Sequence, residues 1–389
     1  MKIVADKNIP FLRGVLEPFA DVVYMPGAAI TKTDVKDADA LIVRTRTKCN
    51  AALLDGTRVK FIATATIGHD HIDHAYCAEH GITWTNAEGC NSSSVQQYLG
   101  AALVHLSLKH RRPFEGTTLG IVGVGNVGSK VARLARVLGM RVLLNDPPRE
   151  RREGSHEFTS LSHVIEASDI ITFHVPLSTT GSDATFHLAD ERFFARLKPG
   201  TILINTSRGE VVETGALKEA LTRRTLSGCV LDVWEHEPSI DTELLTLADL
   251  ATPHIAGYSA DGKANGTAMS VNALSRYFSL GFDRWFPSDV PEPAHPALSI
   301  DDAGLTKEEI LSCAIAHTYD IRSDDERLRR SVSTFEKQRA EYPLRREFTS
   351  YRISVSAQAP PGVKEALEAI GFTTTDTHTN GKKLEDERA

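Results

Sequence analysis

The fold of this 389-residue chain is decided by the stretch Leu119-Gly120-Ile121-Val122-Gly123-Val124-Gly125-Asn126-Val127-Gly128. An apolar strand runs into three glycines with the spacing Gly-x-Gly-x-x-Gly, and a helix with one apolar stripe follows. Gly123 permits the tight turn, Gly125 lets backbone approach a pyrophosphate, and Gly128 lets helix and strand pack closely. The N–H groups at the start of the helix favour phosphates. The stretch predicts a dinucleotide-binding α/β domain, and a glycine-rich turn in another α/β protein is the alternative.

Asp146 favours NAD as the dinucleotide. It ends the next predicted strand, 18 residues beyond Gly128. A carboxylate at this point accepts hydrogen bonds from ribose hydroxyls and repels a 2′-phosphate. The alternative, a preference for NADP, would require an arginine to bind its 2′-phosphate. The arginines that follow Asp146 are Arg149, Arg151 and Arg152.

Short apolar runs alternate with helical stretches along most of the chain, a pattern typical of parallel sheets. We expect an α/β fold with two doubly wound parallel-sheet domains, one from residues 1–95 and 257–286 and one from residues 96–256. Four prolines between residues 287 and 296 mark a linker. Residues 287–380 are expected to form a small α+β domain, and the polar end of the chain is expected to be frayed.

The expected strands are Ile3–Ala5, Val22–Met25, Ala40–Val43, Phe61–Ala65, Ile82–Thr85, Leu119–Val122, Val142–Leu144, Ile170–Phe173, Ile202–Ile204, Cys229–Val233, Leu250–Ala251 and Tyr351–Val355. The expected helices include Asn91–His110, one after the capping box at Thr306, Ala268–Phe278, Asp325–Ala340 and Val363–Ile370.

Composition narrows the class of protein. The net charge is −7, from 44 basic and 51 acidic residues without a basic block, so we expect no nucleic-acid partner. No stretch approaches the ~20 apolar residues of a membrane helix, and the N-terminus has no long apolar run. The five scattered cysteines contain no C-x-x-C pair. We therefore expect reduced thiols and a cytoplasmic protein with no membrane association.

Three residues downstream of the glycine turn could carry chemistry. Arg208, Glu237 and His254 each follow a short apolar run, so we expect them at the carboxyl edge of a parallel sheet, where ligands bind. A histidine can take the proton of a hydroxyl whose carbon loses hydride, a carboxylate can orient that histidine, and an arginine can grip a substrate carboxylate. Each residue alone has an ordinary structural explanation. Together they predict hydride transfer at a carbon beside a carboxylate.

With these residues the chain resembles the D-isomer-specific 2-hydroxyacid dehydrogenase family, over roughly residues 1 to 285. Within the family it is most similar to a subgroup that oxidises 4-phospho-D-erythronate to (R)-3-hydroxy-2-oxo-4-phosphobutanoate in pyridoxal 5′-phosphate (vitamin B6) biosynthesis. The stretches that carry the resemblance are Met1 to Pro10, Val43-Arg44-Thr45-Arg46-Thr47, Ala63-Thr64-Ala65-Thr66-Ile67-Gly68, Ser94-Val95-Gln96-Gln97-Tyr98 and Pro253-His254-Ile255-Ala256-Gly257-Tyr258-Ser259.

The resemblance implies a role for each part of the chain. The first domain would be a substrate-binding lid, the second a Rossmann NAD domain, and the third a dimerisation domain that makes a homodimer. Arg208 and Glu237 would be catalytic, and His254 would exchange the proton. The residues expected to bind NAD are Gly123, Gly125, Asn126, Val127, Gly128, Asp146, Val175, Thr206, Ser207, Arg208, Asp232 and Gly257. Those expected to bind the phosphorylated 2-hydroxy acid are Thr45, Thr66 and Tyr258.

Some alternatives stay open. Another family member, such as a 3-phosphoglycerate dehydrogenase, or a non-enzymatic NAD-sensing binding protein would carry the same motifs. The group that binds the substrate phosphate is not identified; Arg46 is the first candidate, followed by Arg345 and Arg346. Histidines 69, 71 and 74 resemble a metal cluster, but the family resemblance puts a turn and helix start there, so we expect no metal.

Overall fold

The computed structural model describes residues 1–154 and 156–376. These fall into two compact units: residues 1–95 with 257–291, and residues 96–256 with the chain from residue 292 onward. The chain thus passes between the units at residues 95/96, 256/257 and 291/292. Within the described ranges, none of the helices has the length and hydrophobicity needed to span a bilayer.

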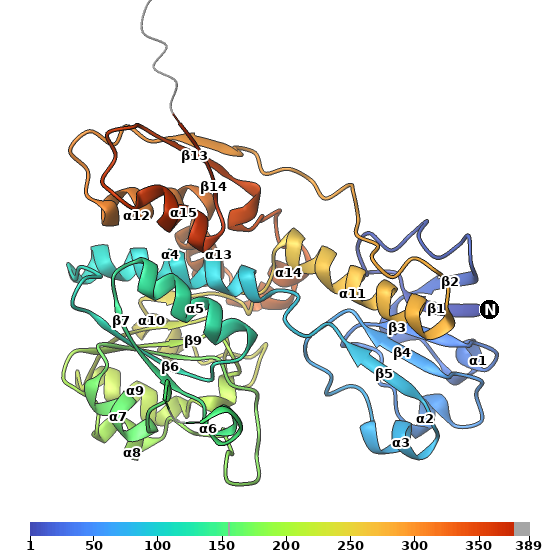
Figure 1. Cartoon of the computed structure of the whole chain (residues 1–389). Helices are drawn as coiled ribbons and strands as arrows, with labels where there is room; N and C mark the ends of the chain where they lie inside the picture. The colour runs from blue at the N-terminus through green and yellow to red at the C-terminus, as the bar shows by residue number, and fades with distance from the viewer. Residues whose placement is uncertain (155, 377–389) are drawn as a thin grey trace, which may run out of the picture. The chain divides into compact units, whose positions relative to one another are not determined.

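The first unit is a five-stranded, all-parallel sheet with the strand order β2-β1-β3-β4-β5 (Figure 1). Its strands are β1 (Lys2–Asp6), β2 (Asp21–Met25), β3 (Ala40–Val43), β4 (Phe61–Thr64) and β5 (Thr83–Asn86). Its helices are η1 (Gly27–Ala29), α1 (Lys32–Val35), α2 (Ala51–Leu54), α3 (His74–Glu79) and α11 (Ala260–Phe278), and α4 (Ser92–His110) begins in this unit. Apolar side chains of α11 pack on one face of the sheet, and those of α1, α2 and α3 pack on the other.

The second unit contains a six-stranded parallel sheet with the order β11-β10-β9-β8-β6-β7. Its strands are β6 (Thr118–Val122), β7 (Arg141–Asn145), β8 (Ile170–Phe173), β9 (Thr201–Asn205), β10 (Leu226–Leu231) and β11 (Leu250–Ala251). Its helices are the main part of α4, then α5 (Asn126–Val137), α6 (Pro147–Glu153), α7 (Leu161–Ala167), α8 (Glu191–Ala195), η2 (Gly209–Val211), α9 (Thr214–Thr222) and α10 (Thr242–Leu247). Because β7 and β8 lie on opposite sides of β6, the strand order reverses there, which is where open α/β sheets bind ligands.

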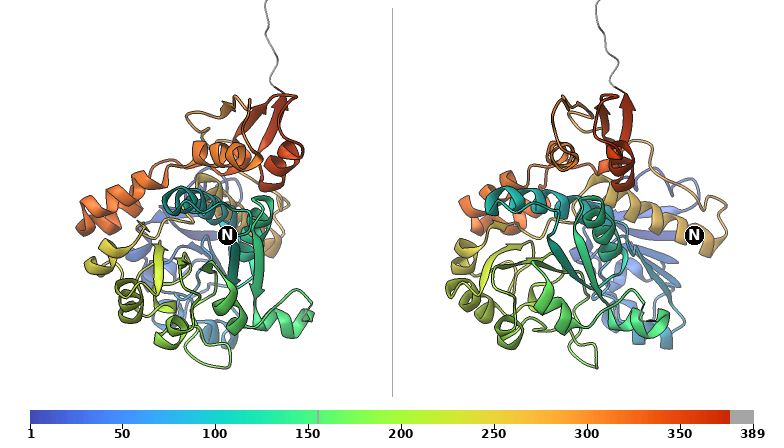
Figure 2. Two further views of the ribbon diagram at one scale, coloured as in Figure 1. Left: turned by 90° about the vertical axis from the view of Figure 1, so that its left-hand side faces the viewer. Right: turned by 60° about the vertical axis from the view of Figure 1, so that its left-hand side comes forward.

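The C-terminal segment adds a small parallel sheet with the order β12-β13-β14. Figure 2 shows this sheet, with α12 (Lys307–Thr318) and α15 (Val363–Ile370), as a further layer beyond α4 of the same unit. Its elements are β12 (Ala297–Ser299), α12 (Lys307–Thr318), α13 (Ile321–Arg330), η3 (Val332–Thr334), α14 (Phe335–Ala340), η4 (Phe348–Ser350), β13 (Arg352–Val355), α15 (Val363–Ile370) and β14 (Thr373–Asp376). Helix α15 contacts α5, and α13 contacts the edge strand β11.

The expected fold class is confirmed: two doubly wound parallel sheets and a small third sheet. Every expected strand is present, and the capping box at Thr306 opens α12 as expected. The single helix expected over Asp325–Ala340 is wrong, because the chain breaks at Ser331 into α13, η3 and α14. The expectation of a frayed end falls largely on residues 377–389, which lie outside the described residues.

Candidate active site

Three neighbouring strands deliver Arg208, Glu237 and His254 to one edge of the six-stranded sheet. Strands β9, β10 and β11 pair side by side in parallel, and each of the three residues follows the carboxyl end of one of them. All three residues belong to the second unit. The sheet topology therefore places the predicted trio along the edge where ligands bind in this class of fold.

Glu237 and His254 form a direct pair. The Nδ1 atom of His254 lies 2.8 Å from Oε2 of Glu237, and the two side chains are 31% and 20% exposed. The other carboxylate oxygen of Glu237 accepts a hydrogen bond from the backbone N–H of Trp234 at 2.9 Å. Because Glu237 accepts at Nδ1, the imidazole carries its proton there and presents Nε2 as the base. This is the arrangement that a general base requires.

Arg208 lies in a loop that packs closely against the segment leading to Glu237. Its Nη1 atom donates to the carbonyl of Ser207 at 2.8 Å, and its own carbonyl accepts from the amide of Asn205 at 2.8 Å. A Cβ added to Gly209 would lie 2.0 Å from the carbonyl carbon of Trp234. Only glycine allows this approach of the two backbones, which holds the Arg208 loop against the segment that leads to Glu237.

Asp232 organises the backbone around His254 from beneath. It is almost fully buried, and it accepts hydrogen bonds from Thr252 Oγ1 at 2.6 Å and from the N–H groups of Ile255 and Ala256 at 2.7 and 2.9 Å. Burial raises the pKa of the Asp232 carboxyl above its usual range, although His254 and these hydrogen bonds act in the opposite direction. In the described structure its carboxylate therefore accepts hydrogen bonds from residues on both sides of His254.

The glycine turn has the geometry that a dinucleotide requires. Gly123 has a φ of +89°, and a Cβ there would lie 2.5 Å from the carbonyl oxygen of His174. A Cβ on Gly128 would lie 2.1 Å from the carbonyl oxygen of Gly123, so only glycine lets α5 pack this closely on β6. A Cβ on Gly125 would meet no described atom within 4 Å, which leaves the start of α5 open to a ligand. The turn, with Asn126 and Val127 as the first residues of α5, thus fits a pyrophosphate.

Asp146 is bound to this turn from the end of β7. Its Oδ2 accepts from the N–H of Val124 at 2.8 Å, and its Oδ1 caps α6 by accepting from the N–H of Arg149 at 2.9 Å. The arginines that could meet a 2′-phosphate are engaged by carboxylates: Arg149 and Arg152 by Glu153, and Arg151 by Asp183. These ion pairs favour NAD over NADP at this position.

The ends of β8 and β9 meet beside the turn. His174 follows β8, and its Nδ1 lies 3.4 Å from the hydroxyl of Thr206, which follows β9. Burial lowers the pKa of His174 to about 3, so its imidazole is neutral at physiological pH. Val175 lies next to Gly123, and Ser207 is buried, with its N–H and hydroxyl donating to Asn205.

The residues expected to bind substrate lie in the first unit. Thr45 and Arg46 are exposed in a turn after β3, which is closed by a hydrogen bond from the N–H of Thr47 to the carbonyl of Arg44. Because the chain turns here, Thr45 and Arg46 are free of the strand alternation that would send them to opposite faces. Thr66 follows β4, and its hydroxyl lies 2.7 Å from that of Thr64.

Gly257 and Tyr258 also belong to the first unit and lie just before α11. A Cβ on Gly257 would lie 2.1 Å from the amide nitrogen of Asn91, so close packing by itself explains the glycine. Tyr258 is partly buried, and the ammonium of Lys263 lies 5.4 Å from the centre of its ring.

Comparison with known proteins identifies the family. Residues 96–256 match the model of the D-isomer specific 2-hydroxyacid dehydrogenase NAD-binding domain. The chain is 54% identical over 357 residues to erythronate-4-phosphate dehydrogenase of Bacteroides fragilis, covering 92% of this chain and all of that protein. It is 51% identical over 355 residues to the enzyme of the same name from Bacteroides thetaiotaomicron, covering 91% and 99%.

The chain belongs to the erythronate-4-phosphate dehydrogenase family.

Among solved structures, D-lactate dehydrogenase from Aquifex aeolicus, complexed with NAD and lactic acid, matches with a TM-score of 0.57 and 26% identity. The match covers 75% of this chain and all of that one. Residues 290–371 match a separate model, described only as a domain of unknown function. The match to an NAD-binding domain identifies the cofactor of this family member as NAD.

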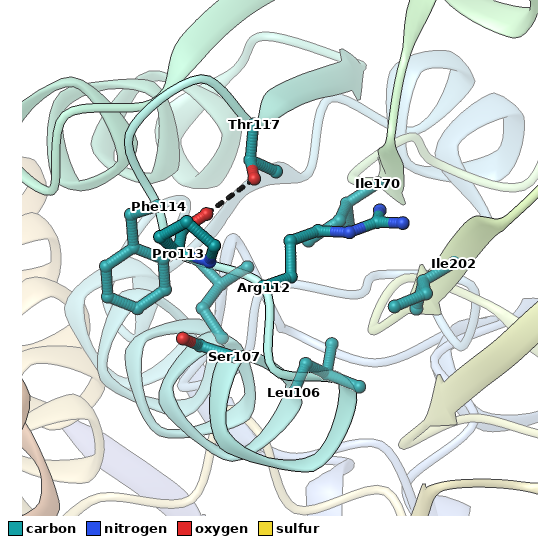
Figure 3. Close-up of a pocket in the computed structure, with 9 residues that line it drawn as sticks. Leu106, Ser107, Arg112, Pro113, Phe114, Thr117, Ile170 and Ile202 are labelled. Atoms are coloured by element: carbon teal, nitrogen blue, oxygen red, sulfur yellow. Dashed lines mark hydrogen bonds between the residues drawn. The ribbon is translucent and has the colours of Figure 1, made fainter.

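One cavity in this family member is not a substrate site. A cavity of about 10 Å³ lies at the amino ends of β8 and β9, opposite the edge that carries the trio (Figure 3). The guanidinium of Arg112 crosses it to reach the carbonyls of Asp169 and Gly200 at 3.4 and 3.3 Å. Such a volume holds at most one water molecule.

The histidines that resembled a metal cluster interact with each other and with an aromatic ring. Nδ1 of His69 lies 3.0 Å from Nε2 of His74, and His74 stacks on Trp84. His71 instead lies 3.1 Å from the hydroxyl of Thr64. Among the described residues no group of three or more His, Cys, Asp or Glu side chains could hold a metal ion. Asp73 caps α3 by accepting from the N–H of Tyr76 at 3.0 Å.

Sequence reasoning missed the residues that support the trio. Asn205 holds the Arg208 loop, while the hydroxyl of Tyr98 donates to that of Thr252, which in turn donates to Asp232. Arg345, ranked low as a phosphate contact, is buried against the His254 loop. A residue that precedes the arginine, such as Asn205, could have been suspected from its position. Nothing in the local sequence indicates Arg345.

Proposed function

We propose that this protein oxidises 4-phospho-D-erythronate to (R)-3-hydroxy-2-oxo-4-phosphobutanoate with NAD, in pyridoxal 5′-phosphate biosynthesis. The observation that carries the proposal is the His254–Glu237 pair, whose Nδ1 and Oε2 atoms lie 2.8 Å apart at the sheet edge that also bears Arg208. The chain is also 54% identical to erythronate-4-phosphate dehydrogenase of Bacteroides fragilis. In the reaction the C2–H and O–H bonds of the substrate break and a C2=O bond forms. The proton passes to the protein and the hydride to the cofactor.

His254 accepts the proton of the C2 hydroxyl through Nε2, because Nδ1 donates to Glu237. The Glu237 carboxylate fixes the ring and stabilises the imidazolium that forms. Arg208 holds the C1 carboxylate and polarises the C2 oxygen, which requires its guanidinium to exchange the Ser207 carbonyl for the substrate. When bound, NAD supplies the acceptor for the hydride that leaves C2.

The residues proposed to hold NAD are those of the glycine turn together with Asp146, Val175, Thr206, Ser207, Arg208, Asp232 and Gly257. Asp232 and Gly257 are included because of their positions, since Asp232 follows β10 directly and Gly257 follows the His254 loop. Asp146 is proposed to select NAD over NADP because its carboxylate repels the 2′-phosphate of NADP.

Thr45, Thr66 and Tyr258 are proposed as the substrate contacts. The support is their position: two of them follow the carboxyl ends of β3 and β4, and the third follows the His254 loop. Arg46, exposed in the turn beside Thr45, is the proposed partner of the substrate phosphate. A guanidinium there would meet phosphate with two parallel hydrogen bonds.

The proposal is tested by steady-state assay of NAD reduction with 4-phospho-D-erythronate and with 3-phosphoglycerate. We expect kcat/KM for 4-phospho-D-erythronate to exceed that for 3-phosphoglycerate by at least about 100-fold. A preference for 3-phosphoglycerate would make the protein a different family member. Absence of turnover with every 2-hydroxy acid, together with tight NAD binding, would favour an NAD-sensing binding protein.

We further propose that the protein is a cytoplasmic homodimer assembled through residues 287–380. The five cysteines are all free thiols, four of them buried, which suits a reducing compartment. Within the described residues, β12 and β14 each pair on one side only, and Leu344 of this segment is 52% exposed. Unpaired strand edges of this kind can pair with a second copy, and Leu344 adds an exposed apolar side chain to the same segment.

A further inference from the structure

The loop that carries His254 is held in an unusual backbone conformation. His254 has a φ of +57°, in the left-handed region that residues with a side chain rarely adopt. Such a conformation persists only when the surrounding structure holds it. Backbone bonding to the end of β10 stops at His254, whose N–H donates to the carbonyl of Asp232 at 2.7 Å. Beyond that point the loop has only Ile255 and Ala256 before the chain leaves the second unit. The position of the imidazole therefore depends on the groups that bind this loop.

Two oppositely charged side chains bind the loop backbone. Asp232 accepts from the N–H groups of Ile255 and Ala256, as described above. Arg345 binds the carbonyls of the same two residues: its Nη2 donates to that of Ile255 at 3.1 Å and to that of Ala256 at 2.6 Å. The residue after His254 and the next one are thus fixed through both their donors and their acceptors. One of the two clamps comes from the C-terminal segment.

Arg345 is built into that segment. It is only 5% exposed, and its guanidinium lies 4.5 Å from the ring centre of Tyr319 and 5.6 Å from that of Tyr342. The hydroxyls of both tyrosines donate to the same oxygen of Asp324, each at 2.7 Å. This buried aromatic and acidic setting stabilises a guanidinium, which stays charged in proteins. It also limits the directions in which the side chain can point.

The segment is anchored near the loop at further points. Asp325 of α13 accepts from the N–H of Ala251, the last residue of β11, at 2.7 Å. The carbonyl of Arg346 accepts from the side chain of Gln97 at 2.7 Å. Gln97 lies two residues after the first passage between the units, and Ala256 lies at the second. The segment thus contacts the rest of the second unit close to the two points where the chain passes between the units.

We propose that Arg345 is a positioning residue for His254, and that residues 292–376 thereby complete the catalytic centre of their own chain. The inference rests on the proposed function, since it assigns the support of the base that this function requires. It gives the domain of unknown function a task besides any part in assembly. It also places Arg345 on backbone carbonyls rather than on substrate phosphate.

The test compares Arg345→Met and Arg345→Lys with the wild type in the full-length protein. Arg352→Met is the matched control, because Arg352 lies exposed on β13 of the same segment. For each protein we would measure kcat and KM for 4-phospho-D-erythronate, the Kd for NAD by protein fluorescence, and the melting temperature. The Kd for NAD reports whether the glycine turn is intact. A lower kcat with an unchanged Kd therefore indicates a displaced His254 and not a misfolded NAD-binding domain.

We expect Arg345→Met to lower kcat at least about 10-fold with the Kd for NAD changed less than about 2-fold, because small displacements of a catalytic group are costly. Arg345→Lys keeps the charge and should recover part of kcat, and Arg352→Met should match the wild type. If Arg345→Met does not fold, Arg345→Lys decides, with a kcat several-fold below wild type expected. A folded Arg345 variant with wild-type kcat would overturn the inference. An inactive wild type would instead overturn the proposed function, on which the inference depends.

Discussion

His254 receives its orientation from its side chain and from its backbone. Glu237 binds Nδ1, and the left-handed backbone at His254 is held by hydrogen bonds to the two peptides that follow. The side-chain partner could be predicted from the sequence, because residue type and position at neighbouring strand ends indicated it. The backbone support could not, because it depends on a carboxylate and a guanidinium whose roles no local pattern reveals.

Replacing His254 with alanine should lower kcat by about 10²–10⁴-fold, the usual contribution of a general base. The Kd for NAD should change little, since the glycine turn and Asp146 lie on other strands. Steady-state kinetics and NAD titration of the purified variant measure both quantities. An unaffected kcat would remove His254 from the mechanism.

Replacing Glu237 with glutamine keeps the size and the hydrogen-bonding capacity of the side chain but removes its charge. We expect kcat to fall by about 10²-fold, because a neutral amide does not stabilise the imidazolium and can hold the wrong tautomer. Glu235→Gln is a control two residues away, whose carboxylate pairs with His187 and not with His254. Equal kcat values for Glu237→Gln and wild type would show that the pair has no catalytic role.

At the scale of elements, Asp169 joins the amino ends of the strands in the second unit. It accepts from the N–H of Thr118 at 2.9 Å and from the ammonium of Lys198 at 2.6 Å, and Arg112 lies 3.8 Å away. Burial alone would raise the pKa of Asp169, but Lys198, Thr118 and Arg112 outweigh it and lower the pKa. The charged carboxylate therefore stabilises the fold.

The stabilisation by Asp169 should depend on pH. A lowered pKa in the folded state means that the stabilisation is complete above the unfolded pKa of about 3.9 and is lost as the pH falls through the folded value. Asp169→Asn should thus lower the free energy of unfolding by about 1 kcal/mol at pH 7 and by much less near pH 3. Urea unfolding at the two pH values checks this. The same loss at both would contradict the electrostatic explanation.

The elements that could be predicted from the sequence are those with strong apolar patterns. Most of the strands from β1 to β11 are short apolar runs, and α5 has a clear apolar stripe beside its glycines. The first half of α11, from Ala260, was missed because its buried positions are alanine, glycine and threonine, which give no apolar periodicity. Strand β14 was missed for the same reason, since Thr373–Asp376 has no apolar residue.

At the scale of the whole molecule, the extent of the two large sheets could be predicted, but the attachment of the C-terminal segment could not. Its contacts with the second unit join residues far apart in the chain, such as Gln97 with Arg346 and Ala251 with Asp325. Contacts of this kind depend on the packed surfaces of two finished elements. A single sequence carries no local signal for them.

The proposed homodimer should have twice the mass of one chain in light scattering at micromolar concentration. Leu344→Glu places a charge on an exposed apolar side chain of the proposed interface, so it should shift the protein toward the monomer. Leu108→Glu, at an exposed position of α4 outside residues 287–380, is the matched control. A wild-type protein of single-chain mass would contradict the dimer.

The path of the hydride is the sharpest test of the proposed reaction. The wild-type protein would be incubated with NAD and 4-phospho-D-erythronate carrying deuterium at C2, and the reduced cofactor would be analysed by mass spectrometry. We predict one deuterium in each reduced nicotinamide ring, with the 2-oxo acid as the other product. Reduced cofactor without deuterium, or no reduced cofactor at all, would contradict the account.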